Sequence, residues 1–195
     1  RVKQGNPLDP TTMIGAQASN DQLEKILSYI DVGKKEGAQL LTGGERAHLG
    51  GELEDGFYVR PTVFFGHNKM RIFQEEIFGP VVSVLTFRTP QEAVAKANNT
   101  PYGLSAGIWT EKGSRILWMA DQLRAGVVWA NTFNRFDPAS PFGGYKASGI
   151  GRGGEIFGWL CSAPSPSVRE SPPGSATGER MARIGSASGS GVLVG

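Results

Sequence analysis

The chain of 195 residues is 39% hydrophobic and has a formal net charge of +2, with acidic and basic residues mixed along its length. No apolar run approaches the ~20 residues of a membrane span and no dense Lys/Arg cluster occurs, so neither a membrane protein nor a nucleic-acid-binding protein is predicted. The single cysteine, Cys161, excludes an intrachain disulfide, and the first ten residues lack the apolar core of a signal peptide. A soluble, cytoplasmic protein is expected.

The first third of the sequence predicts a helix followed by strands. Ser19 and Gln22 have the spacing of a capping box, and an apolar stripe of helical period follows them. Its members are Leu23, Ile26, Leu27 and Ile30. Glycines at 33 and 37 predict the end of this helix. Residues 38–41 then predict a short strand, and a polar, glycine-rich loop continues to about residue 56.

The middle of the sequence alternates strands with helices. Residues 58–65 and 81–87 are rich in β-branched and aromatic side chains and predict two strands. Thr89, Pro90 and Glu92 supply the cap, first position and third position of a helix, whose core-facing residues are Ala93, Val94 and Ala97. A strand at 104–109, a helix at 114–123 and a strand at 126–130 follow. In that last helix Ile116, Leu117 and Ala120 are predicted to face inward.

This alternation predicts an α/β fold with a mostly parallel sheet and helices on its faces. In open sheets of this class the ligand site lies beyond the carboxyl ends of the strands, so the loop at residues 131–154 becomes a candidate. The loop contains four aromatic residues, Phe133, Phe136, Phe142 and Tyr145. These rings line a pocket or simply pack the loop onto the core, and composition alone leaves both interpretations open.

Two adjacent acids, Glu75 and Glu76, lie in an apolar frame, and neighbouring side chains of an extended segment point to opposite faces. Only one of them is therefore expected to face a site. A carboxylate near Ile77 needs a partner, which is either a polyhydroxyl ligand such as ribose or a structural ion pair with Lys69 or Arg71. The sequence leaves both alternatives open.

Other candidate motifs predict no chemistry. Residues 149–154 match the spacing G-x-G-x-x-G, but no buried strand precedes them, so a phosphate loop is not predicted. His48 and His67 are isolated, which gives no metal site, and Cys161 has no nearby histidine to activate it. The sequon at residues 98–100 is interpreted as a turn at the end of a helix.

Four segments together resemble the aldehyde dehydrogenase superfamily. They are EEIFGPV at residues 75–81, ANNTPYGL at 97–104, GVVWAN at 126–131 and PFGGYKASG at 141–149. Their order and spacing are those of the family, and the resemblance covers about residues 5–152. It implies that residues 1–160 are the later part of the family's catalytic domain. Residues 161–195 are rich in Ser, Gly and Pro and have too few large apolar residues to form a core, so their composition predicts a disordered tail.

The resemblance also implies site residues. Glu76 stands at the position that binds the hydroxyls of the nicotinamide ribose, and Phe78 at the position beside the nicotinamide. Asn131 matches the asparagine that ends the last core strand near the pocket, while Phe136 and Phe142 match loop positions that line the aldehyde channel. The implied cofactor is NAD or NADP and the implied substrate is a small aldehyde. Intact members of the family are homo-oligomers.

In the family a cysteine thiolate attacks the aldehyde, a hydride passes to the cofactor, and a glutamate-activated water cleaves the thioester. The glycine-glutamine-x-cysteine sequence around the nucleophile does not occur here. The resemblance therefore implies that the catalytic cysteine and the general base lie upstream. No catalytic residue is assigned in this chain, and the chain alone is expected to be inactive. Residues 153–155 lead into the tail where the family has a short helix and an assembly strand. A non-catalytic fragment or a module that associates with full-length homologues is the alternative.

Overall fold

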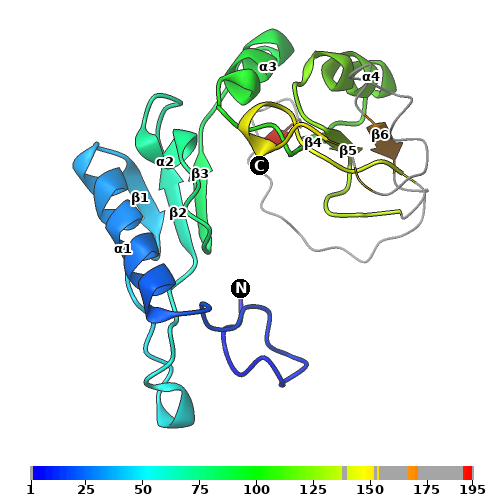
Figure 1. The fold of residues 1–195 in the computed structure, drawn as a ribbon. Coiled ribbons are helices and arrows are strands. Elements are labelled where there is room, and N and C mark those ends of the chain that lie inside the picture. Colours follow the sequence, from blue (N-terminus) through cyan, green and yellow to red (C-terminus); the bar gives the residue numbers. More distant parts are fainter. Residues whose placement is uncertain (1, 138–139, 152, 154–166, 171–190, 195) are drawn as a thin grey trace. The chain divides into compact units, whose positions relative to one another are not determined.

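The computed structural model describes residues 2–137, 140–151, 153, 167–170 and 191–194 (Figure 1). The chain divides into two compact units, Arg1–Leu85 and Thr86–Gly195. Each unit contains one sheet and its own buried apolar cluster, and parallel strands occur in both sheets. The predicted α/β fold class is confirmed, although two sheets replace the single sheet that was expected.

Unit 1 has a three-stranded sheet in the order β1-β2-β3, in which β1 is antiparallel and β3 is parallel to β2. Its elements are α1 (Asn20–Lys35), β1 (Gln39–Thr42), the 3-10 helix η1 (Gly51–Leu53), β2 (Thr62–Phe65), α2 (Arg71–Gln74) and β3 (Val81–Val84). Helix α1 lies along the sheet in Figure 1, and its Leu23, Ile26 and Ile30 share one buried cluster with Phe64 of β2. The helical stripe predicted from the sequence is therefore the face that packs on the sheet.

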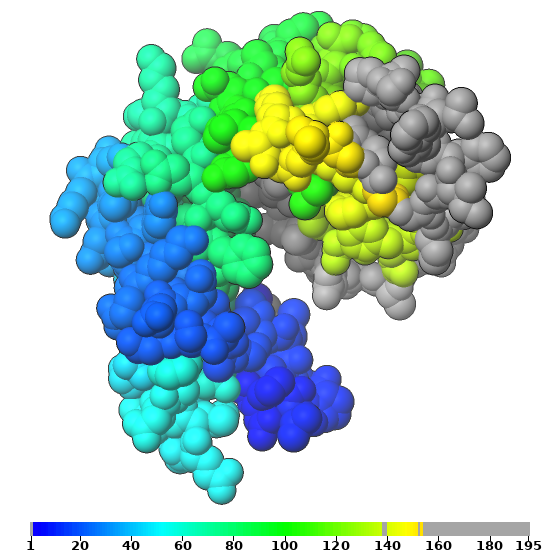
Figure 2. Space-filling view, viewed as in Figure 1, coloured from blue at the N-terminus to red at the C-terminus, as the bar shows by residue number. Residues whose placement is uncertain are grey.

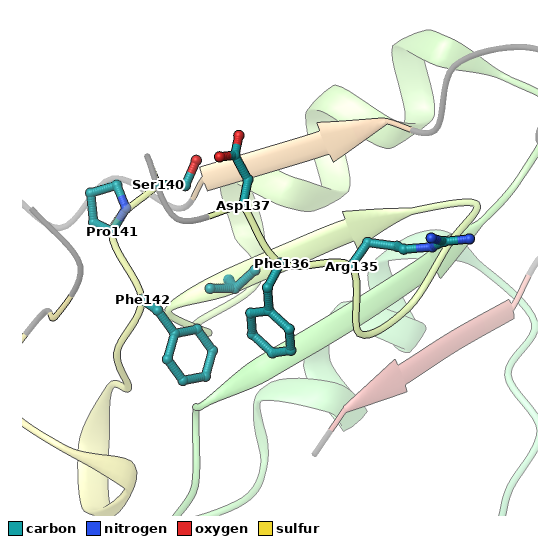
Figure 3. A pocket seen from close by; sticks show the side chains of 7 residues that line it. Arg135, Phe136, Asp137, Ser140, Pro141 and Phe142 are labelled. Carbon is teal, nitrogen blue, oxygen red and sulfur yellow. The ribbon is translucent and has the colours of Figure 1, made fainter.

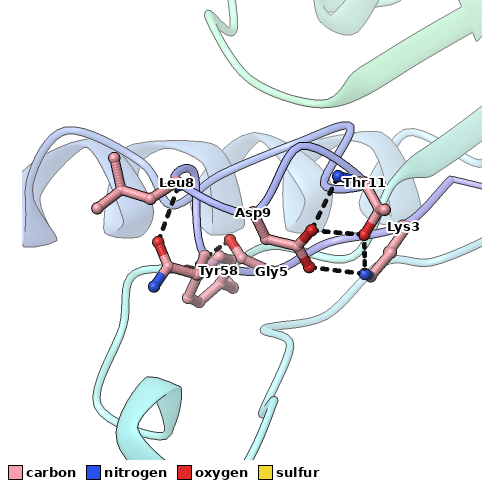
Figure 4. A network of polar contacts seen from close by, with 7 residues as sticks. Lys3, Gly5, Leu8, Asp9, Thr11 and Tyr58 are labelled. Carbon is pink, nitrogen blue, oxygen red and sulfur yellow. Dashed lines mark hydrogen bonds and ion pairs between the residues drawn. The ribbon is translucent and has the colours of Figure 1, made fainter.

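The N-terminal loop of unit 1 is held by polar contacts (Figure 4). The Asp9 carboxylate accepts hydrogen bonds from the Thr11 amide at 2.9 Å and the Thr11 hydroxyl at 2.7 Å, and it pairs with the Lys3 ammonium at 2.9 Å. These donors, Lys3 first, hold the pKa of Asp9 well below its usual range. The hydroxyl of buried Tyr58 donates to the Gly5 carbonyl at 3.0 Å, which fastens the loop to the core.

Unit 2 has a four-stranded sheet in the order β6-β5-β4-β7. Its elements are α3 (Pro90–Asn98), β4 (Ser105–Trp109), α4 (Gly113–Gln122), β5 (Val127–Ala130), the 3-10 helix η2 (Lys146–Ser148), β6 (Ser167–Glu170) and β7 (Gly191–Val194). Strand β5 is parallel to β4 and β6, β7 is antiparallel to β4, and every residue of β5 is buried. The predicted strand-helix-strand order holds for β4-α4-β5, whereas α3 connects strands of different sheets.

Helix α4 buries a different stripe from the one predicted. Ile116 and Ala120 are buried as expected, but Leu117 is 64% exposed and Met119 takes the inward position. The reason is the helical period: Ile116, Met119 and Ala120 follow the spacing i, i+3, i+4, whereas Leu117 lies about 100° further round the helix. The predicted inward position of Leu117 was therefore wrong.

Strands β6 and β7 lie in the stretch predicted to be disordered, and the sequence does not predict either of them. The remainder of that stretch, Cys161 included, lies outside the described residues, so the domain division at residue 160 stays a prediction. Within the part of the chain that the structure describes, the helices are too short or too polar to cross a membrane.

Candidate active site

The adjacent carboxylates of Glu75 and Glu76 follow α2 and have different surroundings. Glu75 accepts hydrogen bonds from Arg71 Nε and Nη2, both at 2.9 Å, and from the Tyr29 hydroxyl at 2.8 Å. The Arg71 guanidinium, with Tyr29, lowers the pKa of Glu75 to about 2. Glu76 is exposed and has no hydrogen-bond or ion-pair partner among the described residues. The structural ion pair left open by the sequence thus exists, with Arg71 rather than Lys69, and it belongs to Glu75.

Phe78 is displayed on an unusual backbone. Its φ is 57°, in the left-handed region, and its side chain is 72% exposed. The side-chain amide of Gln22 donates to the carbonyls of Phe78 at 2.8 Å and Ile77 at 3.2 Å. Gly79 passes so close to α1 that a Cβ there would lie 2.4 Å from Ile26 Cδ1. Strain of about 1–3 kcal/mol at such a residue persists only where the surroundings enforce it, so α1 and this turn together direct the ring outward.

Asn131 stands directly after β5, as the sequence predicted, and also adopts a left-handed φ, 54°. Its Oδ1 accepts from the Thr110 amide at 2.9 Å and its Nδ2 donates to the Thr110 carbonyl at 3.1 Å. Its own amide donates to the Ile108 carbonyl at 2.7 Å. The side chain therefore joins the carboxyl ends of β4 and β5 at the point where the long loop begins.

The aromatic residues of this loop divide between the two interpretations that the sequence left open. Phe133 packs against the strands, with its ring 4.8 Å from that of Trp129 and 6.4 Å from that of Trp109. Phe136 and Phe142 meet edge to face at 5.1 Å, and Phe136 is 58% exposed. These two rings lie side by side in Figure 3, whereas Arg135 points away from them. They line a small hollow together with Val127, Arg135, Asp137, Ser140 and Pro141.

The end of the loop is fastened to the segment after α3 by side chains that sequence reasoning missed. Lys146 Nζ donates to the carbonyls of Asn98 at 2.8 Å and Thr100 at 3.0 Å. Ser148 Oγ accepts from the Gly103 amide at 3.0 Å, and the Gly103 carbonyl accepts from the Tyr145 amide at 2.8 Å. The Gly103 carbonyl also accepts from the Gly126 amide at 3.0 Å, so three of the four segments that resemble the known family meet at one place in unit 2. A conspicuous lysine between glycines was the signal available in the sequence.

Asn98 has a structural role that also accounts for the sequon. Its Nδ2 donates to the Gln122 carbonyl at 2.8 Å, and its Oδ1 accepts from the Arg124 amide at 2.8 Å. Both ends of the side-chain amide thus tie the last residue of α3 to the end of α4, at Gln122 and at Arg124 just after it. This agrees with the interpretation of the sequon as a turn at a helix end.

The glycine-rich stretch after residue 148 does not form a phosphate loop in its described part. The 3-10 helix η2 precedes it instead of a strand, and Gly153 turns back to form a bridge with Phe142. Residues 152 and 154 lie outside the described residues, as does Cys161. His48 contacts Glu54 at 2.8 Å, and no group of three metal-ligating side chains is present among the described residues.

Comparison of the sequence with known proteins gives consistent matches. The model of the aldehyde dehydrogenase family matches residues 1–161. Acetaldehyde dehydrogenase 2 of Cupriavidus necator is 64% identical over 151 residues, which are 77% of this chain and 30% of the relative. The EPTC-inducible aldehyde dehydrogenase of Rhodococcus erythropolis is 62% identical over the same shares. The chain thus spans about 30% of the length of these curated relatives.

Solved structures agree with the sequence matches. HpcC from Thermus thermophilus is 44% identical with a TM-score of 0.78, over 80% of this chain and 31% of that one. An indole-3-acetaldehyde dehydrogenase mutant from P. syringae, solved with NAD+ and IAA, is 48% identical with a TM-score of 0.75, over 81% of this chain and 32% of that one. With a family match over most of its length and these identities, the chain belongs to the aldehyde dehydrogenase family.

Proposed function

We propose that this chain supplies the cofactor-side and aldehyde-side walls of an NAD(P)-dependent aldehyde dehydrogenase, which oxidises a small aldehyde to a carboxylic acid. The observation that supports it best is the division between two adjacent acids. Glu75 is bound by Arg71 and Tyr29, while Glu76 and the ring of Phe78 project outward from a frame fixed by α1. A carboxylate that has no partner among the described residues and lies near an exposed aromatic ring is available to a polar ligand.

The displayed groups fit a nicotinamide nucleotide. Bound NAD(P)+ would supply the acceptor for a hydride. An unpaired carboxylate accepts hydrogen bonds from the two neighbouring hydroxyls of a ribose, and an exposed aromatic ring offers an apolar surface to a flat heterocycle. Glu76 and Phe78 are accordingly the cofactor-binding residues of this proposal, and the solved indole-3-acetaldehyde dehydrogenase with NAD+ supports the choice of cofactor.

The aldehyde-side wall of the proposal comes from the loop after β5. Phe136 and Phe142 give a hollow of aromatic character, which suits an apolar aldehyde. Asn131 sets the point where the loop leaves the sheet, since its amide already bridges to Thr110. The substrate-binding residues are therefore Asn131, Phe136 and Phe142, with the aromatic pair forming the contact surface.

The 195 residues alone carry no turnover in this proposal. Oxidation through a thioester requires an activated cysteine and a general base, and positioning of substrate cannot replace the covalent step. The one cysteine of the sequence, Cys161, has no histidine nearby in the chain. The cytoplasmic location and homo-oligomeric assembly expected from the sequence accompany the proposal as expectations.

Three proteins assayed for aldehyde-dependent reduction of NAD+ and NADP+ test this function. They are the chain itself, its Cys161→Ala variant, and a hybrid enzyme in which the aligned 151 residues of the Cupriavidus relative are replaced by those of this chain. We expect turnover only in the hybrid. A folded but inactive hybrid contradicts the proposal, and activity of the chain that Cys161→Ala abolishes would make Cys161 the nucleophile. Association of the chain with the unaltered relative, combined with an inactive hybrid, favours the interaction module.

A further inference from the structure

Lys146 has a combination of features that a surface lysine does not need. Its backbone adopts a left-handed φ of 53°, which is strained for a residue with a side chain. Its ammonium reaches the carbonyls of Asn98 and Thr100, at 2.8 and 3.0 Å, across more than forty residues of sequence. Burial, with repulsion from Arg124, lowers the pKa of Lys146 below its usual value. The residue is exposed, and its ammonium is directed at these two backbone carbonyls.

The target of this ammonium is the last residue of α3, Asn98, together with Thr100 two residues beyond the helix. The last carbonyls of a helix have no partner within the helix, and a cation there is favoured by both hydrogen bonding and the helix dipole. The neighbours of Lys146 reinforce the contact, because the Ala147 amide donates to the Pro101 carbonyl at 3.0 Å and the Tyr145 amide donates to the Gly103 carbonyl at 2.8 Å. The whole stretch 145–148 is therefore clasped to the segment that follows α3.

The bound stretch 145–148 is connected to the rings of Phe136 and Phe142 through the backbone at Gly143, which precedes this stretch. Gly143 lies against the start of β5, where a Cβ on Gly126 would be 1.6 Å from the Gly143 carbonyl oxygen. Phe142 directly precedes Gly143 in the chain, and its ring contacts the ring of Phe136, which in turn lies 5.5 Å from the ring of Trp129. Only residues 143–145 lie between Lys146 and Phe142 in the chain. Residues 141–151, in yellow in Figure 2, are exposed or partly exposed apart from buried Gly144, so tertiary burial alone does not hold this run.

We infer that Lys146 is a positioning residue: by binding the carbonyls at the end of α3 it seats the loop that carries Phe136 and Phe142. Its consequence for an aldehyde rests on the proposed function, because that function makes these rings the substrate wall. The structural part of the inference does not depend on turnover. Trp129 provides a natural reporter, since its indole Nε1–H donates to the Arg135 carbonyl at 2.9 Å, inside the same loop.

The test uses the full chain labelled with 15N and three variants, Lys146→Met, Lys146→Arg and Lys112→Met. Lys112 is a matched control, because it lies in unit 2 and its ammonium has no partner among the residues described. The readouts are the indole N–H resonance of Trp129 and amide hydrogen exchange at Tyr145, Ala147 and Gly103. Amides of α1 report whether each variant remains folded.

We expect Lys146→Met to shift the Trp129 resonance and to accelerate exchange at the three amides about tenfold or more, since hydrogen bonds from a charged donor are lost. Amide exchange in α1 should stay unchanged. Lys146→Arg should remain close to the parent chain, because a guanidinium also donates hydrogen bonds to carbonyls. Lys112→Met should behave as the parent chain. An unchanged Trp129 resonance with unchanged exchange would overturn the inference, as would equal acceleration in α1. Failure of the proposed function would appear separately, as an inactive hybrid enzyme.

Discussion

Residues 75–81 of unit 1 and residues 141–149 of unit 2 both belong to segments that resemble one family, yet they use polar side chains in opposite ways. In the first, one acid is bound internally and the next is left exposed beside a displayed ring. In the second, Lys146 and Ser148 bind the backbone of the same unit, and the exposed surface is aromatic. The first segment offers a charged acceptor, and the second offers an apolar wall.

The difference shows that a family motif combines two kinds of residue. At Gly79 and Gly126 neighbouring atoms leave no room for a Cβ. Glu75 binds the side chains of Arg71 and Tyr29, and Lys146 binds two backbone carbonyls. Glu76 and Phe78 have no such role among the described residues and are exposed, and our proposal assigns them to a ligand. Substitution of the glycines or of the internally bound side chains should alter stability, and substitution of the exposed side chains should alter ligand binding.

The largest expected effect is from Gly126→Ala. A Cβ at this position would lie 1.6 Å from the Gly143 carbonyl oxygen, so the loop and β5 cannot keep their contact. We expect a loss of about 3 kcal/mol or more in the free energy of unfolding, measured by urea titration. Gly113→Ala is the control, because nothing lies within 4 Å of a Cβ there. Equal stability of the two variants would show that the loop does not pack on β5 as described.

A smaller effect is expected from Asn131→Ala, which removes two hydrogen bonds to Thr110. Asn134 is a matched control because its φ of 56° is close to the 54° of Asn131, whereas its side chain has no partner among the described residues. Both alanine variants share the backbone strain, so their difference isolates the side-chain bonds. We expect Asn131→Ala to be less stable than Asn134→Ala by about 1–3 kcal/mol, and equal melting curves would refute the bridge between β4 and β5.

Tyr29→Phe should have a smaller effect still. The change removes one hydroxyl that donates to Glu75 at 2.8 Å, for a loss of about 1 kcal/mol in the free energy of unfolding. It should also raise the pKa of Glu75, because that hydrogen bond stabilises the ionised form. Tyr102→Phe serves as the control, since the Tyr102 hydroxyl has no described partner. NMR titration of the Glu75 carboxyl carbon in both variants provides the second measurement.

The smallest effect is the pH dependence contributed by Glu75. Its pKa is lowered to about 2 in the folded chain from an ordinary value of 4.5, so its stabilisation is present above the unfolded value and is lost as pH falls through the folded one. The difference in Tm between the parent chain and Glu75→Gln should therefore be constant near neutral pH and should shrink between about pH 4.5 and pH 2. A difference that stays constant across this interval would mean that the ion pair with Arg71 does not form in solution.

Much of the fold could be predicted because local chemistry determines it. Ser19 and Thr89 cap α1 and α3 through hydrogen bonds to residues three further on, as their spacing indicated. The inward face of α4 was misplaced because Leu117 and Met119 are both apolar, and only packing decides between their positions. The division of the strands into two sheets could not be predicted either, because it depends on pairing between strands that are distant in sequence.

The site was predictable to a lesser degree. The residues predicted that only one of two adjacent acids faces a site, and the family resemblance selected Glu76. The hydrogen bond that holds Glu75 could not be predicted, because its donor Tyr29 lies 46 residues away along the chain. Gln22 had the spacing of a capping box, whereas its amide in fact holds the Phe78 turn. Contacts between residues distant in sequence leave no local pattern, and for this reason the roles of Gln22 and Lys146 emerged only from the structure.

The most direct test of the account is the Michaelis constant for NAD+ of the hybrid enzyme with Glu76→Gln or Glu75→Gln. Because only Glu76 is free to accept from ribose hydroxyls, we predict that Glu76→Gln raises this constant about tenfold or more without lowering the melting temperature. Glu75→Gln should lower the melting temperature and change the constant by less than about twofold. The reverse pattern, with Glu75→Gln impairing cofactor binding and Glu76→Gln leaving it intact, would contradict the division of roles between the two acids.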